Sequence, residues 1–254
     1  MSGTLHVTRP GEHLVLVEID QPPRNALGTA LRARFLEALE AAEADPAVRA
    51  VVVTGRGEAF CSGDDLREAQ QRGGEDPAAL AQFGRLLDRV EGFRAPIVAA
   101  VNGWCVGGGL ELALCCDLRV ASTEARFVCA GVNVGLVASA WRLPRLIGVA
   151  RAKALLLTGA PCDAATAERY GLVTALHAPD ALLPEALALA GRIASRAPLS
   201  VEATKRIASR APDLSAEEAR EAQGRELLQL VRTRDHAAAV EAFVTKREPT
   251  FTRS

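Results

Sequence analysis

The chain has 254 residues, of which 49% are hydrophobic and 24% are charged, which is enough to bury a substantial core in one or two domains. Its formal net charge is -1, from 30 Lys plus Arg against 31 Asp plus Glu, so no overall positive field favours nucleic acid. The first residues contain no apolar signal core, and nowhere do about 18 apolar residues run together. We therefore expect a cytoplasmic protein that does not engage a membrane.

Segments with strand and helix patterns alternate in the first half of the chain, which predicts an α/β fold with parallel strand pairing. Apolar runs predict strands, and apolar residues at helical spacing, such as Leu31, Phe35 and Leu39, predict helices. The predicted elements are a strand at 13–20, a helix at 29–44, a strand at 48–54, a glycine-containing loop at 55–66, a polar and mobile stretch at 67–76, a helix at 77–93, a strand at 97–101, a helix at 108–116, and strands at 118–121 and 126–130.

From about Leu143 the sequence is rich in alanine and leucine and has helical periods. Asp163 is expected to cap a short helix that ends at Gly171. The other predicted elements are a strand at 173–176 and helices at 180–196, 199–209 and 215–245. No low-complexity linker separates the halves, so we expect an α/β core at 1–195 and a helical region at 196–254 that packs on the core or on a neighbour.

The six cysteines include no CxxC pair, and two of them are adjacent, so their spacing matches neither zinc sites nor redox motifs. We expect no metal site. The cysteines are expected to be small buried hydrophobic residues of a protein in a reducing compartment.

Three consecutive glycines, Gly107 to Gly109, open the predicted helix within the segment WCVGGGLELALCCDL. Close packing of a helix on a strand explains one glycine better than three, and the GxGxxG spacing of a dinucleotide site is absent. A third interpretation is an anion site, because a helix N-terminus offers unpaired N–H groups. A second glycine loop, AFCSGDDL at 59–66, also follows a strand, so two backbone amides could converge on one oxygen as an oxyanion hole.

These two glycine segments resemble the enoyl-CoA hydratase/isomerase family, the crotonase superfamily. The resemblance covers nearly the whole chain, and the motifs are specific when taken together. The other matching segments are NAL at 25–27, LTGAPCDAATAERYGLV at 157–173 and EAFVTKREPTF at 241–251.

The resemblance implies a ClpP/crotonase fold, a spiral of ββα turns with a C-terminal helical region at 196–254 that forms a homotrimer or a dimer of trimers. It implies an acyl-CoA thioester as substrate, with CoA as part of that substrate and no further cofactor. Matched by position, the oxyanion donors are the backbone N–H groups of Asp64 and Gly108. Negative charge that collects on the thioester oxygen as an enolate forms would be held there.

The resemblance also places CoA contacts at Arg24, Phe243 and Lys246, the last two commonly reaching a neighbouring subunit. A solvated surface charge is the alternative for Arg24 and Lys246. The further substrate-binding positions are Ala26, Ser62, Asp65, Leu66, Gly107 and Gly131, and Asp65 matches an aspartate that usually holds its loop by hydrogen bonds.

Glu111 lies three residues after Gly108 and, because helix side chains point towards the N-terminus, its carboxylate is expected to face the same cavity. It matches the first of two catalytic glutamates of a hydratase. The place of the second falls on Gly131, and glycine cannot transfer a proton. Asp64 is a minor candidate to replace it, and a carboxylate introduced as Gly131→Glu is expected to raise hydration where the pocket is intact.

The sequence therefore predicts an acyl-CoA enzyme of the hydratase/isomerase family in which robust hydration is doubtful. The alternatives are thioester hydrolysis, decarboxylation or other enolate chemistry in the same pocket. A homologue that binds acyl-CoA without turnover is the alternative from a different functional class.

Overall fold

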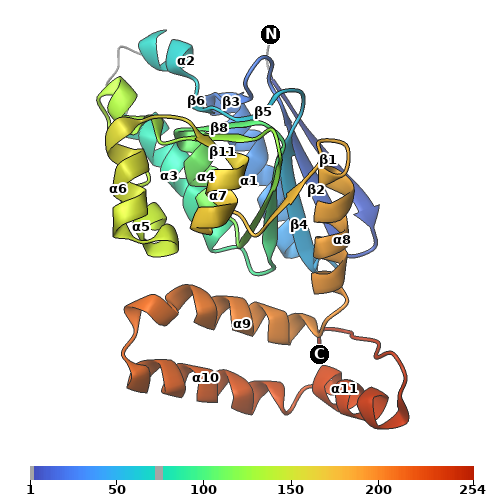
Figure 1. Ribbon diagram of the computed structural model, residues 1–254. Coiled ribbons are helices and arrows are strands. Elements are labelled where there is room, and N and C mark those ends of the chain that lie inside the picture. Colours follow the sequence, from blue (N-terminus) through green and yellow to red (C-terminus); the bar gives the residue numbers. More distant parts are fainter. Residues whose placement is uncertain (1–2, 72–76) are drawn as a thin grey trace.

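A six-stranded sheet forms the centre of the computed structural model, which describes residues 3–71 and 77–254 (Figure 1). The strand order is β1-β2-β4-β7-β9-β12, and every neighbouring pair is parallel except β1 with β2. The α/β class with parallel pairing is thus confirmed. The strands are β1 Thr4–Gly11, β2 Leu14–Asp20, β4 Ala50–Gly55, β7 Ile97–Val101, β9 Leu118–Ser122 and β12 Ala175–His177.

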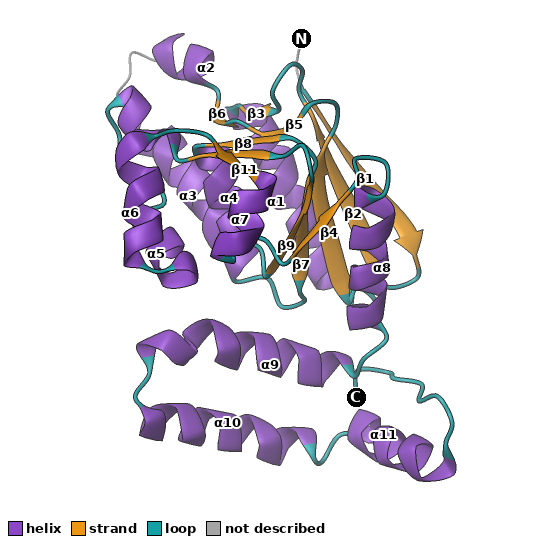
Figure 2. Cartoon of the chain, in the orientation of Figure 1, coloured by secondary structure: helices purple, strands orange, loops and turns teal. Residues whose placement is uncertain are grey.

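Helices cover both faces of this sheet (Figure 2). Ala50 and Val52 pack towards α8 (Leu182–Ala194) on one face. Val51 and Val53 face the larger core on the other side, which also contains α1 (Thr29–Ala44), α3 (Pro77–Glu91) and α4 (Gly108–Cys115). A strand that is buried on both faces needs a continuous apolar run, which is the pattern that predicted β4 and β7.

A second, smaller sheet has the order β11-β10-β8-β5, and a separate two-stranded pair joins β3 to β6. After β4, β7 and β9, the chain adds a strand to the small sheet before it reaches the next helical segment, giving the expected ββα turns. The prediction of a plain loop at 55–66 is wrong, because β5 and β6 lie within it. The bounds are β3 Ala26–Leu27, β5 Ala59–Cys61, β6 Gly63–Asp64, β8 Trp104–Val106, β10 Arg126–Val128 and β11 Cys162–Asp163.

Short helices connect these strands. The stretch predicted to be polar and mobile begins with a helix, α2 (Leu66–Gln71), and its residues 72–76 lie outside the described residues. The strand predicted at 126–130 ends at Val128, and a 3₁₀ helix, η1 (Ala130–Val134), follows it. The helices α5 Arg142–Ile147, α6 Val149–Thr158 and α7 Ala164–Tyr170 come next.

The predicted cap of α7 is confirmed. The Asp163 carboxylate accepts a hydrogen bond from the Thr166 N–H, and Gly171 ends the helix in the left-handed conformation at φ 82°. This conformation is the one in which glycine carries no steric penalty.

The C-terminal helices form a separate layer below the core in the view of Figure 1. They are α9 Pro198–Arg210, the 3₁₀ turn η2 Ala211–Asp213, α10 Ala216–Leu230 and α11 Arg234–Thr245. The single helix predicted at 215–245 is wrong, because the Thr233 side chain caps a new helix by accepting from the His236 N–H. No helix within residues 3–71 and 77–254 combines the length and apolar character needed to cross a membrane.

One buried carboxylate ties this layer to the core. Glu202, on α9, accepts from Arg94 at 2.8 Å and pairs with Arg253 at 3.0 Å. Burial raises the pKa of Glu202, but its hydrogen bonds and charge pairing with the two arginines outweigh burial and lower the pKa overall. Glu202 therefore stays ionised near neutral pH and holds the first C-terminal helix against the core.

Candidate active site

The two glycine loops meet because their strands are neighbours. β5 and β8 pair in parallel, with Ala59 opposite Trp104, so the carboxyl ends of both strands lie at the same end of the small sheet. β5 leads into β6, and β8 leads into the N-terminus of α4. The two glycine segments named in the sequence analysis therefore begin at the same end of the small sheet.

Each glycine at this junction has its own physical reason. Gly107 has φ 52°, a conformation in which a side chain is strained. A β-carbon on Gly109 would lie 2.0 Å from the Cys61 carbonyl oxygen, and one on Gly63 would lie 2.5 Å from the Gly108 nitrogen. The backbone of β6 therefore abuts the first turn of α4, where the leading N–H groups have no acceptor within the helix.

A cavity of about 800 Å³ opens in front of these amides. Apolar side chains such as Leu80, Phe83, Leu87 and Val106 form much of its wall. The predicted site residues that line it are Arg24, Ala26, Ser62, Asp64, Asp65, Leu66, Gly107, Gly108, Glu111 and Gly131. One concave site with an apolar wall and a few convergent polar groups is the usual form of a small-molecule site.

Glu111 is a buried carboxylate of the cavity that two protein donors hold. It is 9% exposed, and its two oxygens have separate donors. Oε1 accepts from the Ser139 backbone N–H, and Oε2 accepts from Arg142 Nη1 at 3.3 Å. Glu111 lies one helical turn after Gly108, the first residue of α4. Because helix side chains point towards the N-terminus, the helix places this carboxylate beside its own N-terminal amides.

The two aspartates of the loop are engaged with protein groups. Asp64 forms an ion pair with Arg32, with Nη2 3.2 Å from Oδ1, and the Arg32 side chain is fully buried. Asp65 caps α2, since its Oδ1 accepts from the N–H groups of Arg67 and Glu68 at 3.0 and 3.3 Å. These bonds agree with the loop-holding role predicted for Asp65.

Gly131 is buried beneath the turn that follows it. A β-carbon there would lie 2.8 Å from the Leu136 carbonyl oxygen and 3.0 Å from the Ala138 nitrogen. Asn133 points elsewhere and donates to the Gly159 carbonyl at 3.0 Å. The substitution Gly131→Glu would therefore displace backbone, so the expectation that it simply restores an acid does not fit this packing.

The predicted CoA contacts fall into two groups. Arg24 lies at the cavity, with its guanidinium 5.2 Å from the centre of the Trp104 ring. Phe243 and Lys246 lie on α11 and at its end, in the C-terminal layer and away from the cavity of the same chain (Figure 1). Phe243 is 86% exposed.

The cysteines near the site are not nucleophiles. All six are buried and free, as predicted. Burial raises the pKa of the Cys61 thiol to about 12, so it remains protonated at ordinary pH. Among the described residues that line the cavity, the candidates for acid/base chemistry are therefore the carboxylates Asp64, Asp65 and Glu111.

Sequence reasoning missed three polar residues around the site, namely Arg32, Ser139 and Arg142. Arg32 carried a signal, because it lies at helical spacing from Phe35 and Leu39 on the apolar side of α1. Ser139 and Arg142 carried none, because their contacts with Glu111 join residues about thirty positions apart in the chain.

Comparisons with known proteins agree on one family. A family model described as enoyl-CoA hydratase/isomerase matches residues 10–254. The (E)-benzylidenesuccinyl-CoA hydratase of Thauera aromatica is 40% identical over 85% of this chain and 86% of its own. The crotonyl-CoA hydratase of Syntrophomonas wolfei is 34% identical over 94% and 95%. The crystal structure of an enoyl-CoA hydratase from Bacillus anthracis superposes with a TM-score of 0.93 at 30% identity, covering 98% and 99%, and confirms the predicted fold.

Proposed function

Since the chain belongs to the enoyl-CoA hydratase/isomerase family, we propose that it performs enolate chemistry on acyl-CoA thioesters, with Glu111 as acid and base. The proposed oxyanion donors are the backbone N–H groups of Asp64 and Gly108. The observation that carries this is the placement of Glu111 one helical turn after Gly108, with both residues lining one cavity.

The reaction step conserves atoms and charge. The Glu111 carboxylate removes a proton from the carbon next to the thioester, and the C–H electron pair becomes the carbon–carbon double bond of the enolate. The negative charge moves to the thioester oxygen, where the two amides donate to it. The Glu111 carboxylic acid then returns a proton to the acyl chain. Each donor contributes about 10²–10³-fold in rate, and CoA enters only as part of the substrate.

Hydration needs a second proton carrier that this cavity does not supply readily. The lining carboxylates among the described residues are Glu111, Asp64 and Asp65. Asp65 is used as a helix cap, and Asp64 pairs with buried Arg32. We therefore place the main activity in chemistry that one carboxylate can perform, such as proton exchange, hydrolysis or decarboxylation. Asp64 is the residue that would have to act if hydration is fast.

A panel of acyl-CoA thioesters tests the proposal. Each is incubated with the protein in D₂O and followed by NMR and mass spectrometry for deuterium in the acyl chain, free CoA, or loss of CO₂. Deuterium or product with at least one thioester is the expected result. Binding across the panel without either would contradict the enzymatic proposal and favour the acyl-CoA-binding alternative.

The exposed apolar residues of α10 and α11 support assembly as a trimer, with Phe243 and Lys246 completing the site of a neighbouring subunit. These exposed residues are Leu227 and Leu228 on α10, Val231 directly after it, and Val240, Phe243 and Val244 on α11. In that arrangement Lys246 and Arg24 approach the CoA phosphates from two chains.

The substitution Lys246→Ala tests this arrangement. We expect CoA affinity to fall by up to about fivefold, because an exposed ion pair contributes about 0.2–1 kcal/mol, and the loss should shrink as salt rises. Arg247→Ala, next in the chain, removes the same charge and serves as the control. Titration calorimetry gives both affinities, and equal affinities for Lys246→Ala and the wild type would remove Lys246 from the site.

A further inference from the structure

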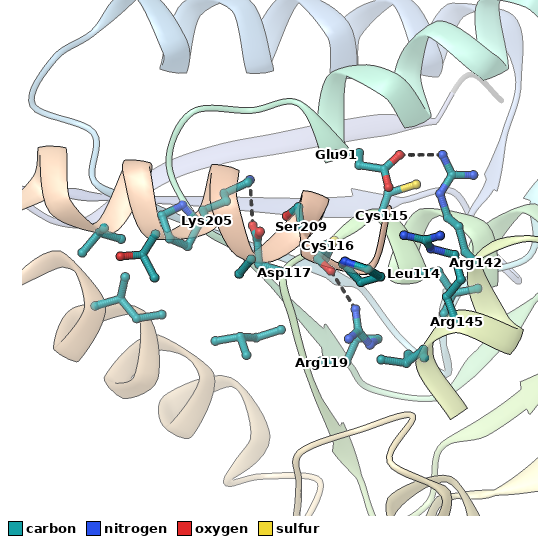
Figure 3. Close-up of a pocket in the computed structure, with 18 of the residues that line it drawn as sticks. Glu91, Leu114, Cys115, Cys116, Asp117, Arg119, Arg142, Arg145, Lys205 and Ser209 are labelled. Atoms are coloured by element: carbon teal, nitrogen blue, oxygen red, sulfur yellow. Dashed lines mark hydrogen bonds and ion pairs between the residues drawn. The ribbon is translucent and has the colours of Figure 1, made fainter. Parts of the chain in front are cut away.

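One arginine bridges two carboxylates that come from different helices. Arg142, the first residue of α5, donates from Nη1 to Glu111 at 3.3 Å and from Nη2 to Glu91 at 2.7 Å. Glu91 is the last residue of α3, and Glu111 is on α4. Figure 3 shows the contact between Arg142 and Glu91 from the side of a second cavity.

Arg142 lies at the boundary between the two cavities. It lines both the substrate cavity and the second cavity, which is about 990 Å³ in volume. Glu91 lines the second cavity and is absent from the lining of the first. Arg142 therefore contacts one carboxylate from the lining of each cavity, and Glu91→Gln changes no residue of the substrate cavity's own lining, so its effect there passes through Arg142.

The Arg142 side chain is held firmly and stays charged. It is 18% exposed, and its guanidinium lies 4.9 Å from the centre of the Trp141 ring. Burial by itself lowers the pKa of Arg142, but the hydrogen bond that it donates to Glu91 and the charges of nearby acidic groups, including Glu111, outweigh burial and raise the pKa. A planar guanidinium can serve two carboxylates at once in a fixed geometry, whereas an ammonium group cannot match that fork.

We propose that Arg142 is a positioning residue that keeps the Glu111 carboxylate in its reactive orientation, and that Glu91 anchors Arg142 for this task. The proposal rests on the function proposed above for Glu111. The Ser139 amide donates to one oxygen of Glu111 and Arg142 donates to the other. These two bonds fix the orientation of the carboxylate, and therefore the directions in which its remaining lone pairs can accept a proton. Groups that transfer protons must be held to a fraction of an ångström, and that is the work of such supporting contacts.

Arg145 provides a matched control on the same helix. Its guanidinium lies 5.2 Å from the same Trp141 ring, and it pairs with Asp213 at 2.6 and 2.8 Å. It lines the second cavity and is absent from the lining of the substrate cavity. The variants Arg142→Met and Arg145→Met thus remove the same group from the same helix, and only the first removes the contact with Glu111.

The experiment measures deuterium exchange of butyryl-CoA in D₂O at saturating concentration, with the dissociation constant measured separately by calorimetry. We expect Arg142→Met to lower the saturated exchange rate by about 10²-fold while the dissociation constant stays close to that of the wild type. Arg142→Lys, which keeps the charge, should recover part of the rate. Glu91→Gln should give an intermediate rate, and Arg145→Met should exchange as the wild type does.

The possible failures are distinguishable. Wild-type rates in Arg142→Met and Glu91→Gln, with Glu111→Gln inactive, would overturn the role of Arg142 and leave the proposed function standing. If Arg142→Met does not fold, the exchange rates of Glu91→Gln and Arg142→Lys test the positioning role of Arg142 in its place. Wild-type exchange rates in both variants would then overturn that role. A wild-type protein that binds butyryl-CoA and the rest of the thioester panel without exchange or product overturns the proposed function, and the positioning role with it.

Discussion

The substitution Glu111→Gln is expected to lower the exchange of butyryl-CoA protons by about 10²–10⁴-fold, the usual contribution of a general acid or base. Glutamine has the same shape as glutamate but cannot carry the proton. The effect should appear in the saturated rate rather than in binding, because in the proposed function Glu111 supplies the reacting group and the CoA part of the substrate contacts other residues. Exchange is followed by NMR at several enzyme concentrations.

Folding must be separated from chemistry in this variant. Glu111 accepts from both Ser139 and Arg142, and a glutamine amide would direct two N–H groups at one of these donors. A modest fall in melting temperature is therefore expected, measured by circular dichroism. An unchanged exchange rate in folded Glu111→Gln would remove Glu111 from the chemistry.

Closing the oxyanion hole should have the second large effect. At Gly108, a β-carbon would lie 2.7 Å from the Phe83 ring and 3.0 Å from the Gly63 α-carbon. We expect Gly108→Val to lower the exchange rate by about 10²–10³-fold, the loss of one donor, because the branched side chain stands where the thioester oxygen must approach the amide. Rates are again measured by NMR exchange at saturating butyryl-CoA.

A neighbouring glycine controls for packing. Gly109 faces the Cys61 carbonyl oxygen, which a β-carbon would approach to 2.0 Å, so Gly109→Ala should lower the melting temperature most. At Gly108 the nearest contact is the Phe83 side chain, and the backbone contact with the Gly63 α-carbon is longer, at 3.0 Å, so we expect Gly108→Val to lower the melting temperature less and to remain folded. Folded Gly108→Val with near wild-type exchange would exclude the Gly108 amide as a donor.

Long apolar runs made much of the fold predictable. The strand Ile97–Val101 is buried on both faces of the sheet, and its five residues are all apolar, which is the sequence pattern that such burial requires. The three-residue strand at Trp104 and the two-residue strand at Gly63 were missed, because periodicity cannot be seen over so few positions. The break before α11 was also missed, although Thr233 is a good capping residue.

The site was predictable only as far as local motifs carried it. Gly108 and Glu111 are three residues apart, so helix geometry alone places them on one wall. Arg142 reaches Glu111 across a turn whose shape depends on three-dimensional packing, including Ser139 at φ 59°. The surroundings of Gly131 depend in the same way on how residues 136–138 fold back over it, which no spacing rule could reveal.

The most direct test of the central claim is the incubation of a mixture of crotonyl-CoA and butyryl-CoA with the wild-type protein in D₂O, followed by NMR so that hydration of the first and deuterium exchange of the second are seen together. We propose that Gly131 stands where hydration would need a second carboxylate, so hydration of crotonyl-CoA should be slower than the range of about 1–10³ s⁻¹ that is ordinary for enzymes. Butyryl-CoA, whose saturated carbon next to the thioester carries removable protons, should take up deuterium there in a Glu111-dependent way. Hydration within that ordinary range would contradict the account and would require another residue, with Asp64 first, to supply the second proton.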